Sequence, residues 1–88
     1  MVVEGKMEVE VRSLTFGEQL VGLNFNPSAD DKVAQAKILF AKAADLLEQE
    51  YRAKNLGASP LADTLYNHAI GEVLNAQMSV VKVLTLKY

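Results

Sequence analysis

The segment Phe25-Asn26-Pro27-Ser28 places an aromatic ring, an amide and a hydroxyl beside the expected start of a long helix. Backbone N–H groups at a helix start can hold a phosphate, and an aromatic ring can stack on a base. Phe25, Asn26 and Ser28 are therefore candidates for nucleotide binding. In the competing interpretation, Phe25 packs against the helix entry and Ser28 only caps the helix. The acidic pair Asp30-Asp31 favours that structural interpretation, because its carboxylates would compete with an anion for the same helix end.

Two lysines, Lys37 and Lys82, lie within or beside apolar stretches of expected helices. Each has the pattern of an ordinary surface lysine whose alkyl chain covers apolar atoms. Each also fits an anion contact at an interface between protomers. Symmetry strengthens this second interpretation, because one lysine per chain supplies two charges across a two-fold axis and three across a three-fold axis.

Catalytic and metal-binding patterns are missing from the sequence. With one histidine and no cysteine, it excludes disulfides, thiolate metal sites and a histidine metal cluster within one chain. His68 stands among apolar neighbours and is expected to be structural or at the surface. Asp45, Glu48 and Glu50 are expected on a solvated helix face and not in a catalytic cleft. We therefore expect a binding protein that is not an enzyme and uses no cofactor or metal.

Three helical segments, 14–23, 29–55 and 60–86, are expected to position the candidate residues. Ser28 is the expected N-cap of the second segment, and Gly57 its expected C-cap. Serine followed by proline at Ser59 is typical of a new helix start. The predicted fold is all-α, with a short N-terminal helix followed by a long antiparallel helical hairpin.

Residues 1–12 alternate between apolar and polar side chains, which is the periodicity of a strand. We favour an extended N-terminal arm, and pairing with another protomer is the alternative. Residues 13–88 form the predicted helical-hairpin, ligand-binding domain. Its second helix is apolar over much of its circumference, including a stripe of Leu39, Ala43 and Leu46. A helix of this kind is covered on more than one side, so other protomers are expected to supply the extra cover.

Composition supports self-association. The chain has 88 residues, of which 50% are hydrophobic, and its net charge is −2. A chain of this length buries only roughly 60–65% of its unfolded surface when it folds alone, so oligomerisation is the expected means of stabilisation. The charge argues against binding to DNA, RNA or an anionic membrane. The N-terminus has no signal-peptide pattern and the apolar runs are short, so we expect a cytosolic protein.

Several segments together resemble the anti-CBASS sponge family of phages, whose helical-hairpin domain also occurs in an anti-Thoeris sponge. The likeness covers roughly residues 13–86. The segments that carry it are Leu14-Thr-Phe-Gly-Glu-Gln-Leu-Val-Gly-Leu-Asn-Phe-Asn-Pro-Ser28, Val33, Lys37, Leu39-Phe-Ala41, Ala76-Gln-Met-Ser-Val-Val-Lys82 and Thr85. Members form homohexamers and sequester the cyclic oligonucleotide signals of bacterial CBASS immunity without cleaving them.

The resemblance implies a function in the cytoplasm of the infected bacterial host. The implied ligands are cyclic dinucleotides such as 3′,3′-cGAMP in pockets between paired protomers, and cyclic trinucleotides in separate pockets near three-fold axes. Lys37 matches the lysine that contacts the dinucleotide, and Phe25 the aromatic that stacks on its bases, with Asn26 and Ser28 lining the same pocket. Lys82 matches a basic position of the trinucleotide pocket that is sometimes arginine, and lysine lacks the bidentate fork of arginine. Two alternatives remain open, a helical protein–protein interaction module and an anti-Thoeris-type sponge for a cyclic ADP-ribose isomer.

Overall fold

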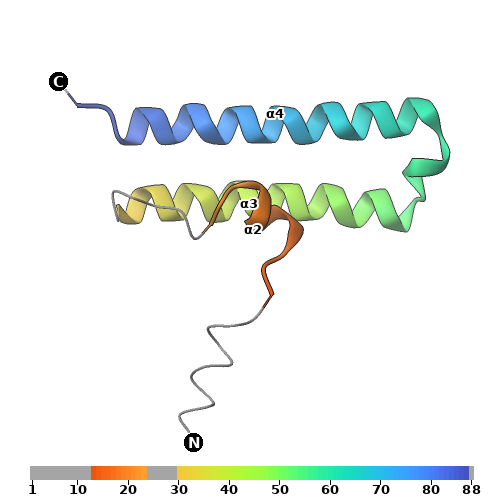
Figure 1. Ribbon diagram of the computed structural model, residues 1–88, viewed down its shortest axis with the longest axis horizontal. Helices are drawn as coiled ribbons and strands as arrows, with labels where there is room; N and C mark the ends of the chain where they lie inside the picture. Colours follow the sequence, from red (N-terminus) through yellow and green to blue (C-terminus); the bar gives the residue numbers. More distant parts are fainter. Residues whose placement is uncertain (1–12, 24–29, 88) are drawn as a thin grey trace, which may run out of the picture.

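The structure, a computed structural model, describes residues 13–23 and 30–87. All regular secondary structure in this part of the chain is helical. In chain order it consists of α2 (Phe16–Leu20), α3 (Asp31–Ala53), the 3-10 helix η1 (Leu56–Ala58) and α4 (Pro60–Leu84). Helices α3 and α4 run antiparallel side by side, η1 joins them at one end, and α2 lies against α3 (Figure 1). The predicted short helix and helical hairpin are confirmed, whereas the predicted arm at 1–12 lies outside the described residues.

Side chains cap the start of each α-helix. Thr15 Oγ1 accepts a hydrogen bond from the Glu18 N–H at 3.1 Å, and Glu18 Oε1 accepts one from the Thr15 N–H at 2.9 Å, which completes a capping box for α2. Ser59 Oγ accepts from the Ala62 N–H at the start of α4, as the Ser59-Pro60 pair predicts. The predicted N-cap of α3 is wrong, because this helix begins at Asp31 and its N-cap is Asp30, not Ser28.

The hairpin turn also differs from the prediction. Asn55, with a φ of 50°, takes the left-handed conformation after α3, so Gly57 is not the C-cap. Gly57 instead makes room for Tyr51, because a Cβ at this glycine would lie 2.6 Å from the Tyr51 hydroxyl oxygen. That hydroxyl donates a hydrogen bond to Asp63 Oδ1 at 2.7 Å, and so links the end of α3 to the start of α4. The ring of Tyr51 also packs on that of Tyr66, with centroids 4.2 Å apart.

The core between the helices is built from small residues. The buried apolar side chains among the described residues are Val21, Val33, Ala36, Ala41 and Ala44. Many larger apolar side chains are exposed on the outer faces of the hairpin, including Leu39, Leu46, Leu61, Leu65 and Val83. Two antiparallel helices in one layer can cover only one side of each other, so these outer faces have no cover within the described part of the chain.

Candidate ligand-binding site

Lys37 is buried in the structure, with 6% of its surface exposed. Its ammonium donates a hydrogen bond to the Gly22 carbonyl oxygen at 3.0 Å. Gly22 has a φ of 63°, a conformation that glycine adopts without the steric cost that other residues meet. The structure therefore rules out the interpretation of Lys37 as an ordinary surface lysine, because its charged end lies inside the protein and joins α3 to the segment after α2.

A cavity of about 370 Å³ lies beside Lys37, between the end of α2 and the C-terminal half of α4. This volume is in the lower part of the range of small-molecule pockets, roughly 300–1,000 Å³. Apolar side chains form most of its lining, and Lys37 and Gln77 contribute the two buried polar groups. The full lining is Gln19, Leu20, Val21, Gly22, Lys37, Leu74, Gln77, Met78 and Val81. A cation and an amide in apolar walls suit a ligand that carries both an anionic group and a flat, weakly polar surface.

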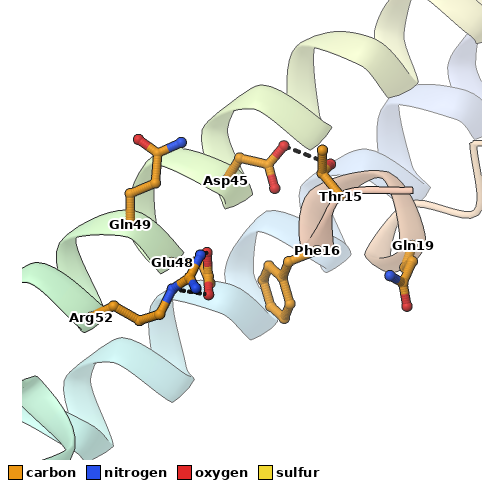
Figure 2. A pocket seen from close by; sticks show the side chains of 7 residues that line it. All are labelled: Thr15, Phe16, Gln19, Asp45, Glu48, Gln49 and Arg52. Carbon is orange, nitrogen blue, oxygen red and sulfur yellow. Dashed lines mark hydrogen bonds and ion pairs between the residues drawn. The ribbon is translucent and has the colours of Figure 1, made fainter. Parts of the chain in front are cut away.

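Helix α2, which carries one wall of this cavity, is fixed to α3 by Asp45. Asp45 Oδ1 accepts a hydrogen bond from the Gly17 N–H at 2.6 Å, and Oδ2 accepts one from the Thr15 hydroxyl at 2.7 Å (Figure 2). The two helices approach so closely that a Cβ at Gly17 would lie 2.0 Å from the Ala41 carbonyl oxygen. The expectation of a solvated face is therefore wrong for Asp45, whose carboxylate fastens α2.

The acidic residues further along α3 have ordinary surface partners. Glu48 pairs with Arg52 at 2.7 Å, and Glu50 pairs with Lys54 at 3.0 Å, each one helical turn apart. The Glu48–Arg52 pair lines a second cavity of about 400 Å³, where the Phe16 ring of α2 faces α3 (Figure 2). Its lining holds two carboxylates, Asp45 and Glu48, and a single guanidinium, Arg52, so this cavity carries net negative charge and does not suit an anionic ligand.

Lys82 lies on the exposed side of α4 and lines a third cavity, of about 340 Å³, with Asn75, Met78 and Ser79. Met78 also lines the cavity beside Lys37. The structure thus places the two candidate lysines in adjacent but different cavities. The other three candidates, Phe25, Asn26 and Ser28, lie outside the described residues.

Gln77 is the lining residue that sequence reasoning missed. It is 5% exposed and sits on the inward face of α4. The signal was present in the sequence, because Val73, Leu74 and Val81, at the helical spacings of minus four, minus three and plus four, are all apolar. A lone glutamine within such a stripe marks a buried polar group.

His68 is exposed, and its Nε2 lies 3.5 Å from a Glu72 carboxylate oxygen one turn away, which confirms the expected surface position. In the part of the chain that the structure describes, no three histidine, cysteine or acidic residues are grouped as metal ligands would be. None of the helices described is both long and apolar enough to cross a bilayer.

Comparisons with protein-family models, with curated proteins and with solved structures give no match for this chain.

Proposed function

We propose that the chain is a phage anti-defence sponge that binds cyclic dinucleotides such as 3′,3′-cGAMP and withholds them from the CBASS immune response without cleaving them. The observation that carries this proposal is the buried Lys37 ammonium beside a cavity with mostly apolar walls. An anionic group that enters this cavity would meet the positive charge of the ammonium in apolar surroundings, where charge-assisted hydrogen bonds are strong. The same lysine is the one that the family resemblance assigns to the dinucleotide.

The proposed sponge is a homo-oligomer, and the resemblance implies a hexamer. The support within one chain is the contrast between a core of valines and alanines and outer faces that expose Leu61 and Leu65 on α4 and Leu39 on α3. A ligand with two phosphates carries two negative charges, and each chain contributes one Lys37. Pairing of two chains would supply both charges and cover the apolar faces.

The Lys82 cavity is the proposed site for a cyclic trinucleotide. Its support is that Asn75 and Ser79 place an amide and a hydroxyl beside the lysine on the exposed face of α4. A cavity formed on one face of one helix needs neighbouring chains to enclose a ligand, which agrees with a site near a three-fold axis.

A protein-binding module is the second candidate function, and the exposed apolar side chains of α4 favour it. Val83 and Leu61 are 69% and 72% exposed, and a partner protein could cover them as well as another copy of this chain could. In this case the Lys37 cavity would have no nucleotide ligand, so the two functions make opposite predictions for nucleotide binding.

Isothermal titration of the purified protein with 3′,3′-cGAMP tests the proposal, with the linear dinucleotide as the control. Tight binding of one cyclic ligand per two chains, and weak binding of the linear one, is the expected result. Cyclic ADP-ribose isomers belong in the same panel, because strong binding of one of them would identify an anti-Thoeris-type sponge. No binding across the panel would overturn the sponge function and favour the protein-binding module.

A further inference from the structure

The Gln77 amide is buried without a hydrogen-bond partner among the described residues. Every described side-chain nitrogen or oxygen that is sealed from solvent does have a partner. The amide of Gln77 therefore keeps some access to solvent, and this access is through the cavity that it lines together with Lys37.

The amide makes no hydrogen bond within the described part of the chain and reaches water only through the cavity, so it contributes little to the stability of the folded protein. Its helical neighbours Leu74 and Val81 show that the site accepts apolar side chains. A methionine has nearly the same length and would fill the same space with an apolar side chain. The choice of glutamine is therefore not explained by packing, and a polar group that enters the cavity would explain it.

We propose that Gln77 recognises the base of the nucleotide whose phosphate Lys37 binds. An amide presents a donor and an acceptor side by side, which matches the edge of a base that carries an acceptor next to an amino group, as adenine does. The apolar side chains of Leu20, Leu74 and Met78 line the same cavity and can contact the faces of the ring. This inference rests on the proposed sponge function and adds the group that reads the base.

The test compares Gln77→Met with the wild-type protein and with Gln35→Met, a matched control in which an exposed glutamine of α3 undergoes the same change. Two quantities are measured, the midpoint of thermal unfolding without ligand and the affinities for cyclic di-AMP, cyclic di-GMP and 3′,3′-cGAMP. Gln77→Met should unfold at the same or a higher temperature. Its affinity for the preferred dinucleotide should fall by at least about tenfold, and its discrimination among the three ligands should shrink. Gln35→Met should match the wild type in both measurements.

Three results would overturn the inference in different ways. Unchanged affinity and ranking in Gln77→Met would show that Gln77 does not read the base, while the sponge function would stand. A lower unfolding temperature, or an equal loss for all three ligands, would show a structural role for the amide. Absence of binding by the wild-type protein would overturn the proposed function and the role of Gln77 together.

Discussion

The Lys37 ammonium donates a hydrogen bond to the Gly22 carbonyl oxygen at 3.0 Å, and this bond connects α3 to the turn that follows α2. The lysine proposed to bind the ligand is thus also part of the protein's own structure. Replacing Lys37 by glutamate would place a carboxylate against the carbonyl oxygen of Gly22, and both groups are acceptors. The variant could then lose binding because it is misfolded, so it would not test the ligand contact. An apolar side chain of similar length separates the two roles.

Lys37→Met should abolish binding of cyclic dinucleotides and lower the free energy of unfolding by about 1.5–3 kcal/mol, the usual contribution of a hydrogen bond made by a charged group. Lys42→Met is the matched control, because Lys42 lies on the same helix and is exposed. Titration calorimetry and urea unfolding measure the two effects. Wild-type affinity in Lys37→Met would remove this lysine from the site.

Gly17 and Gly71 should respond in opposite directions to substitution by alanine. A Cβ at Gly17 would meet the Ala41 carbonyl oxygen at 2.0 Å, so α2 must move, and we expect a loss of about 1–3 kcal/mol in the free energy of unfolding. A Cβ at Gly71 meets no described atom within 4 Å, and this position is inside α4, so alanine should stabilise by about 0.5–1 kcal/mol.

Equilibrium unfolding in urea measures both glycine variants, and ligand titration adds a second readout. Gly17→Ala should also weaken the proposed nucleotide binding, since α2 carries Gln19 and Leu20, which line the cavity beside Lys37. If Gly71→Ala destabilised the protein instead, Gly71 would contact either another chain of the proposed oligomer or a residue outside the described part of the chain.

The helices were predictable from the sequence because their signals are local. Apolar residues recur at helical spacing, and Ser59-Pro60 marks the start of α4. The helix ends were less predictable, since several polar residues compete to cap them: Asp30 caps α3 in place of Ser28, and Asn55 takes the left-handed conformation in place of Gly57.

The cavity beside Lys37 was only partly predictable, because it depends on where α2 lies against α3. Lys37 was identified as a candidate, but its burial follows from the position of Gly22, which no local pattern specifies. The role of Asp45 depends in the same way on the close approach of Gly17. Gln77 could have been found from its apolar helical neighbours, yet the cavity that it lines required the three-dimensional arrangement.

Alkaline pH should weaken the hairpin at Tyr51. The hydrogen bond to Asp63, together with burial, raises the pKa of Tyr51 above its usual value of 10.0, and burial raises the pKa of Tyr66. A group whose pKa is higher in the folded state stabilises fully below its unfolded pKa and loses this contribution as the pH rises through the folded pKa. Stability should therefore decline above about pH 10, where an ionised Tyr51 would face the Asp63 carboxylate.

Tyr51→Phe tests this prediction. The variant should be less stable than the wild type at about pH 8, because the hydrogen bond to Asp63 is lost, and the difference should narrow above about pH 10. Urea unfolding followed by circular dichroism at each pH gives the two curves. Parallel curves would show that Tyr51 does not cause the decline, and Tyr66→Phe, which keeps the Tyr51–Asp63 bond, would then be the variant to compare.

The outer face of α4 should hold the assembly together. Leu65 and Val83 are 61% and 69% exposed, and their separation of 18 residues is five turns of a helix, so both lie on one face. In an isolated chain, Leu65→Glu would change an exposed residue, and the free energy of unfolding should change little. In an oligomer it would bury a carboxylate in an apolar contact, and the assembly should dissociate. Thr64→Glu, an exposed neighbour on a different side of the helix, adds the same charge as a control.

Sedimentation velocity of the three proteins measures the assembly, and titration with 3′,3′-cGAMP on the same samples connects it to function. We expect the wild type and Thr64→Glu to sediment as one large species, and Leu65→Glu as a smaller one that has also lost binding, because one chain supplies a single Lys37 to a ligand with two phosphates. A wild-type protein that sediments as a monomer would contradict the assembly and leave the apolar face to a partner protein. Binding that persists in dissociated Leu65→Glu would instead show that the cavity of one chain is sufficient, and that the oligomer serves stability alone.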